Sequence, residues 1–141
     1  MYSVVSQIDQ YHNFVPYCEK SWVSARDENG MPILAGLQVG FELYNEKFDC
    51  VIECEKDEKV VSKVTQQSNH LFETLYTEWI FKDTPKFGGK KNNANCQVTL
   101  QLQFKFHNPI YNQVSKVFGD KVSSIMIKAF EQRALQLTKV N

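Results

Sequence analysis

Residues 97–106 alternate polar and apolar side chains without a break. Successive side chains of a β-strand point to opposite faces of its sheet, so an alternating segment has one apolar and one polar face. Such a strand belongs in an antiparallel sheet with one side on a core and the other in water. The apolar positions are Val98, Leu100, Leu102, Phe104 and Phe106. The rest of the chain therefore has to cover an apolar sheet face.

A long amphipathic segment follows this strand directly. Asn108 can cap a helix, and Pro109 suits the first helical position. Apolar residues then recur at steps of three and four as far as Phe130, which predicts a helix over residues 109–138 with an apolar stripe. At about 1.5 Å per residue it would be roughly 45 Å long, wider than a domain of this size. We therefore expect a break near Phe118 and Gly119.

The chain before residue 97 reads as one helix and several strands. Helical spacing over residues 6–18, ended by Pro16, predicts a short helix. β-rich runs between turn residues predict strands over residues 21–26, 34–41, 48–54, 60–65 and 71–81. The predicted fold class is α+β, with a curved antiparallel sheet of about six or seven strands wrapped around the long C-terminal helix. We expect one domain over residues 1–141, with an apolar cavity between sheet and helix.

Composition excludes several functional classes. Lys plus Arg and Asp plus Glu each total 16, so no net charge attracts nucleic acid. No window approaches the ~18 consecutive apolar residues of a membrane span. The four cysteines form no CxxC pair and the three histidines are widely separated, so we expect no metal site. The cysteines are interpreted as reduced core thiols.

No catalytic constellation can be assembled from the sequence. It contains no GxSxG elbow and no nucleotide or flavin fingerprint. His12 is interpreted as a helix-surface residue. Glu73 and Glu78 are interpreted as solvent-facing strand residues, with inward acids as the alternative. We therefore assign no catalytic residue and no cofactor.

Charge is distributed unevenly along the chain. Residues 108–141 carry five basic and two acidic side chains, a net +3 that balances −3 over residues 1–107. One interpretation is a solvated helix face, and the other is attraction to an anionic membrane surface or partner. On the second interpretation the membrane-contact residues are Lys116, Lys121 and Lys128.

Short motifs spread over nearly the whole chain resemble one known family. In chain order they are Tyr11 with Asn13-Phe14-Val15-Pro16-Tyr17-Cys18 and Ser21, Leu37-Gln38-Val39-Gly40-Phe41 with Glu46 and Phe48, Trp79-Ile80-Phe81, Cys96 with the alternating run to Phe106, Pro109-Ile110-Tyr111, and Ala129-Phe130-Glu131-Gln132-Arg133. Each is weak alone. Their order and spacing resemble those of the mitochondrial coenzyme Q-binding proteins, members of the START-like superfamily that also includes polyketide cyclases.

The resemblance implies a START-like helix-grip fold and a non-enzymatic carrier that binds ubiquinone or a polyisoprenoid precursor. It would act peripherally on the matrix side of the mitochondrial inner membrane, in respiration and quinone biosynthesis, with quinone biosynthesis enzymes as partners. The ligand-binding residues would be Val39, Phe41, Trp79, Phe81, Leu102, Phe104, Val114, Phe118, Ile125, Met126 and Phe130. Each can equally be interpreted as plain core. The alternatives are a cyclase-type enzyme on a quinone or polyketide-like precursor and an interaction protein that affects ribosome association.

The chain departs from the family pattern at two points. Family members have a further strand before the segment equivalent to residues 2–5. We expect that strand to be absent or supplied by a second copy, which makes a homodimer one expectation. Gly119 stands where the family tends to have a bulky residue, which bears on how rigidly the long helix closes the cavity.

Overall fold

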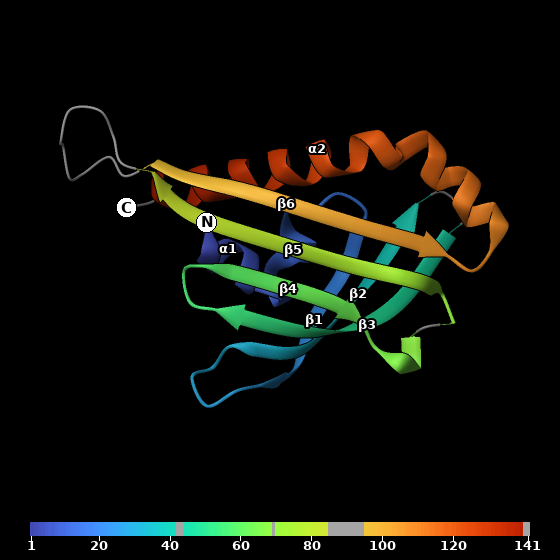
Figure 1. Cartoon of the computed structure of the whole chain (residues 1–141), viewed down its shortest axis with the longest axis horizontal. Helices are drawn as coiled ribbons and strands as arrows, with labels where there is room; N and C mark the ends of the chain where they lie inside the picture. The colour runs from blue at the N-terminus through green and yellow to red at the C-terminus, as the bar shows by residue number, and fades with distance from the viewer. Residues whose placement is uncertain (42–43, 69, 85–94, 140–141) are drawn as a thin grey trace.

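The computed structural model describes the backbone of residues 1–41, 44–68, 70–84 and 95–139, and the side chains of residues 1–40, 45–68, 70–82, 97–109 and 123–137. Over these residues the chain forms a six-stranded antiparallel sheet in which each strand pairs with the next along the chain. The strands are β1 (Cys18–Arg26), β2 (Pro32–Phe41), β3 (Tyr44–Glu55), β4 (Lys59–Val64), β5 (Phe72–Thr84) and β6 (Asn95–Phe106). Figure 1 shows this order.

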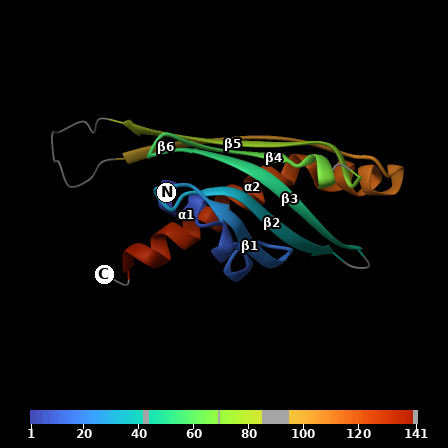
Figure 2. The ribbon, with the colours of Figure 1, turned by 90° about the horizontal axis from the view of Figure 1, so that it is seen from below.

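Four helical segments accompany the sheet in the described residues. They are α1 (Tyr2–Ser6), the 3-10 helices η1 (Ile8–Asn13) and η2 (Gln66–Ser68), and the long helix α2 (Pro109–Lys139). The sheet curves, and α2 runs across its concave side (Figure 2). The predicted α+β class, with a curved antiparallel sheet gripping the C-terminal helix, is confirmed.

Burial along β6 follows the predicted alternation. Leu100 and Leu102 are partly buried, whereas Thr99 and Gln101 between and beside them are exposed. Each of the other predicted strands is also present, with bounds that differ by a few residues. The alternation of side chains across a strand therefore located the sheet correctly.

The predicted break in the last helix is wrong, because α2 is continuous from Pro109 to Lys139. Its length matches the long strands beneath it: β5 has 13 residues and β6 has 12, and at about 3.3 Å per residue each spans roughly 40 Å. A glycine inside a helix costs only about 1 kcal/mol, so Gly119 does not end it. Figure 1 shows that α2 runs alongside β6 and that α2 bends near its own N-terminal end.

The predicted single helix over residues 6–18 is also wrong. The chain instead forms α1, which the sequence did not indicate, and then η1. Gln7 separates the two with φ −84° and ψ 68°, outside the helical region. Tyr17 then adopts a positive φ of 66° immediately before β1 begins, which redirects the chain into the sheet.

Phe130 of α2 joins three parts of the fold. It is fully buried, and its ring lies 5.1 Å from that of Tyr11, 5.0 Å from that of Phe14 and 4.7 Å from that of Trp79. The N-terminal segment, the sheet and α2 therefore meet at one aromatic cluster. Such ring pairs are worth about 0.5–1.5 kcal/mol each beyond the burial of their area.

We predict that Phe130→Ala destabilises the protein by about 3–5 kcal/mol, because it removes a fully buried ring and leaves a cavity. The matched control is Leu135→Ala on the same helix, where the side chain is 60% exposed and the expected change is within about 0.5 kcal/mol. Urea unfolding of both variants measures the difference. Equal loss in the two variants would contradict the role given to Phe130.

Candidate functional site

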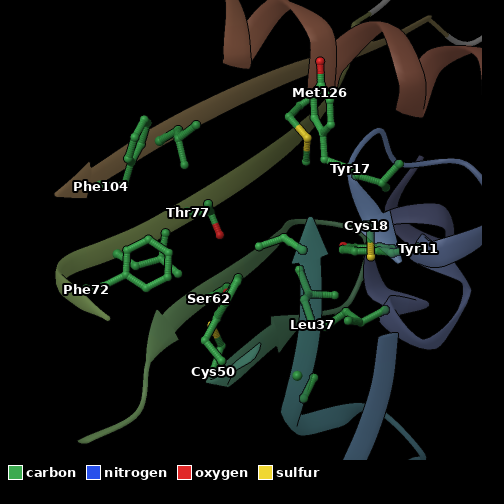
Figure 3. Close-up of a pocket in the computed structure, with 18 of the residues that line it drawn as sticks. Tyr11, Tyr17, Cys18, Leu37, Cys50, Ser62, Phe72, Thr77, Phe104 and Met126 are labelled. Atoms are coloured by element: carbon green, nitrogen blue, oxygen red, sulfur yellow. The ribbon is translucent and has the colours of Figure 1, made fainter. Parts of the chain in front are cut away.

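A cavity of about 380 Å³ lies between the concave face of the sheet and α2. Its lining comes from every strand, from α2 and from the segment around η1, and most of it is aliphatic or aromatic. Ligand pockets have volumes of roughly 300–1,000 Å³ and are mostly apolar with a few polar groups. The predicted apolar cavity is therefore present. Figure 3 shows side chains from the sheet, α2 and the N-terminal segment facing one space.

The structure brings most of the predicted ligand-binding residues to this cavity. Those that line it are Val39, Trp79, Leu102, Phe104, Ile125, Met126 and Phe130. Phe81 is not among the lining residues. Its ring is buried against Tyr2 of α1, with ring centroids 6.0 Å apart, because α1 covers this end of β5. The side chains of Phe41, Val114 and Phe118 lie outside the described residues.

The lining also includes residues that the sequence patterns did not indicate; besides residues of β2, β4, β5 and β6, such as Leu37, Ser62 and Thr77, they form two groups. The first comes from the N-terminal segment and comprises Ile8, Tyr11, Val15, Tyr17 and Cys18. Nothing in a local pattern shows that this segment closes one wall, because the closure depends on contact with Phe130. The second comes from β3 and comprises Phe48, Cys50 and Ile52. Their alternation was noted, and its inward face could have been added to the predicted wall.

Two of the polar side chains in the lining hydrogen-bond to backbone carbonyls. The Tyr11 hydroxyl donates a hydrogen bond to the Val5 carbonyl, and the Cys18 sulfur lies 3.4 Å from the Lys20 carbonyl oxygen. Burial raises the pKa of the Cys18 thiol to about 11, and it also raises the pKa of the Tyr11 hydroxyl. These groups are therefore neutral at physiological pH, and they leave this part of the cavity without charge.

Cys50 lies on the sheet wall beside Ser62 (Figure 3). Burial raises the pKa of the Cys50 thiol from 9.0 to about 11, and the hydrogen bond from Ser62 offsets part of the rise. Cys18, Cys50 and Cys54 are all free thiols. A thiol with a raised pKa is a poor nucleophile, so the cavity cysteines behave as packing residues.

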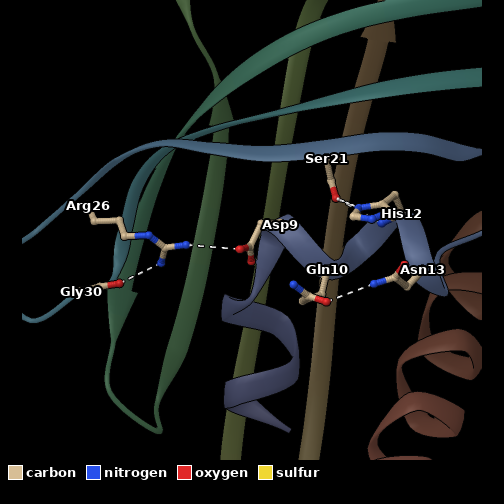
Figure 4. A network of polar contacts seen from close by, with 7 residues as sticks. All are labelled: Asp9, Gln10, His12, Asn13, Ser21, Arg26 and Gly30. Atoms are coloured by element: carbon tan, nitrogen blue, oxygen red, sulfur yellow. Dashed lines mark hydrogen bonds and ion pairs between the residues drawn. The ribbon is translucent and has the colours of Figure 1, made fainter.

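The polar residues of η1 form a surface network, shown in Figure 4. His12 Nδ1 lies 2.8 Å from the Ser21 hydroxyl, and Asp9 pairs with Arg26 at 3.4 Å. These contacts hold η1 against β1 and lie at exposed side chains. His12 is thus a surface residue, as predicted.

The described residues offer no group of three or more His, Cys, Asp or Glu side chains arranged to hold a metal ion. Glu73 is exposed and pairs with Lys105, and Glu78 accepts a hydrogen bond from Tyr76. Neither glutamate lines the cavity. Across the part of the chain that is described, no helix has the length and apolar character needed to cross a membrane. Lys128 is exposed on α2, and the side chains of Lys116 and Lys121 lie outside the described residues.

The chain is similar in sequence to a known family and to named proteins. Residues 1–131 match the family described as polyketide cyclase / dehydrase and lipid transport. The mitochondrial coenzyme Q-binding proteins of Eremothecium gossypii and Saccharomyces cerevisiae are 40% and 36% identical to 99% of this chain, which spans 67% and 66% of their lengths. That of Schizosaccharomyces pombe is 32% identical over 95% of the chain, which spans 77% of it.

A solved structure is also similar in fold. A START superfamily protein from Mycobacterium smegmatis matches 96% of this chain and 88% of its own, with a TM-score of 0.67 and 23% identity. At that identity the likeness concerns the fold alone. It agrees with the curved sheet and the crossing helix.

We predict that the stability of the protein falls between pH 9 and pH 11, in part through Cys50. Its thiol stays protonated in the folded state up to about pH 11, whereas in the unfolded state it ionises near pH 9.0. The stabilisation is therefore complete below pH 9 and is lost as the pH rises towards 11. Cys50→Ala should lose less of its Tm over this range than the wild type, and the exposed-site control Val51→Ala should behave as the wild type. Identical pH profiles for all three would contradict the prediction.

Proposed function

We propose that this chain binds ubiquinone or a polyisoprenoid precursor in its cavity. The premise is that it belongs to the polyketide cyclase/dehydrase and lipid transport family and is related to the mitochondrial coenzyme Q-binding proteins. It acts as a carrier and chaperone that delivers the quinone for respiration and quinone biosynthesis. The ligand contacts Val39, Trp79, Leu102, Phe104, Ile125, Met126 and Phe130. Phe41, Val114 and Phe118 are proposed as further ligand contacts.

The observation that carries this proposal is the apolar cavity itself. A polyprenyl tail gains about 0.8 kcal/mol for each buried CH₂-sized group, so an apolar wall holds it without strong polar contacts. The cavity, at about 380 Å³, lies near the lower end of the ~300–1,000 Å³ occupied by drug-sized ligands. A long-tailed quinone exceeds that size. The ring and the first isoprene units therefore occupy the cavity, and the remaining tail leaves through its mouth.

A carrier fits the cavity chemistry better than a cyclase does. A cyclase needs a base or acid aimed at its substrate. Burial raises the pKa of Cys18, Cys50 and Tyr11, so these groups are protonated near neutral pH. Among the described lining residues, the carboxylate of Glu46 is the one acidic group. Because the related proteins are named as binding proteins, we propose a non-enzymatic role.

We further propose that the protein works on the matrix side of the mitochondrial inner membrane as a peripheral protein, where quinone biosynthesis enzymes would be its partners. Related proteins from three fungi are named mitochondrial. The C-terminal segment has a net charge of +3, which favours contact with anionic lipid. Lys116, Lys121 and Lys128 supply this contact.

We predict that organic extraction of the protein, purified from a ubiquinone-producing host, yields ubiquinone. Leu102→Trp should yield several-fold less, because the indole ring would occupy cavity space. The matched control is Leu137→Trp on α2, a site that is 40% exposed, and it should keep the wild-type yield. If wild-type protein yields no polyprenyl quinone and added ubiquinone leaves its Tm unchanged, the proposed function is wrong.

Membrane contact is tested separately with vesicles that contain cardiolipin. Each basic residue near an anionic surface contributes about 1 kcal/mol, and Lys128→Glu changes the charge by two units, so it should weaken the affinity for the vesicles by roughly 30-fold at low salt. Lys20→Glu, at an exposed site on β1, is the control of equal charge change. Equal weakening by both variants would mean that net charge, and not the α2 surface, controls binding.

A further inference from the structure

Two hydroxyl side chains interrupt the apolar wall that the sheet gives to the cavity. Ser62 of β4 and Thr77 of β5 are register partners, and both line the cavity. Ile52 is the register partner of Ser62 on one side, and Leu102 is that of Thr77 on the other. Figure 3 shows the Thr77 oxygen projecting into the cavity, with Ser62 close to Cys50. The two hydroxyls are thus a local polar pair in an apolar row.

The Thr77 hydroxyl has no partner in the part of the chain that the structure describes. The Ser62 hydroxyl interacts with the Cys50 sulfur, which is a weak hydrogen-bond partner. In contrast, Tyr11 and Cys18 already interact with backbone carbonyls. Glu46, as a carboxylate, offers acceptors and no donor. Ser62 and Thr77 are therefore the side chains of the described sheet wall best placed to donate a hydrogen bond to a ligand.

Ser62 and Thr77 are partly buried and face the cavity. An apolar ligand that filled the cavity would displace water from their hydroxyls without replacing its hydrogen bonds, which is unfavourable. Valine would match the shape of threonine there, favour the strand equally and avoid this loss. The pair becomes favourable when a bound molecule supplies acceptors. We propose that Ser62 and Thr77 form the headgroup subsite of the cavity and donate hydrogen bonds to the oxygens of a quinone ring.

This subsite rests on the proposed function and adds the orientation of the ligand. Directly opposed residues on antiparallel strands have Cβ atoms about 4.5–5.5 Å apart, so two hydroxyls can contact neighbouring oxygens on one edge of the ring. A ubiquinone ring carries such neighbours, a carbonyl oxygen beside a methoxy oxygen. The ring lies against the sheet between β4 and β5, and the tail extends from it along the apolar lining.

The same pair accommodates both redox forms of the ring. A hydroxyl can donate to a quinone carbonyl, and by rotating it can accept from a quinol hydroxyl. No charged group or bound metal is needed for either contact. The subsite therefore recognises the oxygenated ring and not its oxidation state.

The test compares two ligands that differ in the ring. Delipidated protein is titrated by calorimetry with a short-tailed ubiquinone and with an isoprenoid hydrocarbon of similar length, which has no quinone ring and no oxygen. Ser62→Ala combined with Thr77→Val should bind the ubiquinone about tenfold more weakly and the hydrocarbon as well as the wild type does. Thr77→Ser keeps the hydroxyl and should retain most of the ubiquinone affinity. Thr74→Val, at an exposed position of the same strand, controls for the loss of a threonine from β5.

Each contrary outcome has a separate meaning. If the double variant binds ubiquinone as the wild type does, the headgroup subsite is refuted and the proposed function stands. An equal loss for both ligands also refutes the subsite, because it indicates a change in cavity shape. If wild-type protein binds no ubiquinone, the proposed function itself fails.

Discussion

The packing of Phe130 determines how the rest of the molecule is arranged. Because this one ring contacts Tyr11, Phe14 and Trp79, it sets the distance between α2, the N-terminal segment and the sheet. Ile125 and Met126, one turn earlier on the helix, are held above the concave face and line the open space beneath. The cavity is therefore a consequence of where the aromatic cluster places the helix.

A cavity of this size inside a folded domain is unusual, because protein interiors are normally close-packed. Around an apolar cavity of about 380 Å³, the lining side chains lack the dispersion contacts that a close-packed core would give them. A ligand that fills the space supplies those contacts. The apolar lining and the size of the cavity thus support the same conclusion, that the folded protein is adapted to bind an apolar ligand.

Sequence periodicity located the strands, because the side chains of β6 alternate strictly and burial follows them. The predicted break near Gly119 was wrong because a helix of roughly 45 Å was taken to be longer than the domain is wide, whereas β5 and β6, with 13 and 12 residues, are long enough to match it. Sequence periodicity also failed for the wall around Tyr11, which depends on tertiary contact with Phe130. Phe81 shares the inward face of β5 with Trp79, but the cover by α1 removes it from the cavity.

A strand pattern cannot tell a residue that lines a cavity from one that fills a core, since both are apolar and both point inward. Polar residues that break the apolar pattern can distinguish a cavity lining from a filled core. Ser62 and Thr77 occupy inward positions where valine would be more favourable in a closed core, and they lie opposite each other on adjacent strands. Two polar residues that are register partners and face the cavity are more informative about a ligand than the whole set of apolar residues around them. Because their hydroxyls favour an acceptor-rich ring over a plain hydrocarbon, they would give the cavity its selectivity, while the apolar wall supplies most of the affinity.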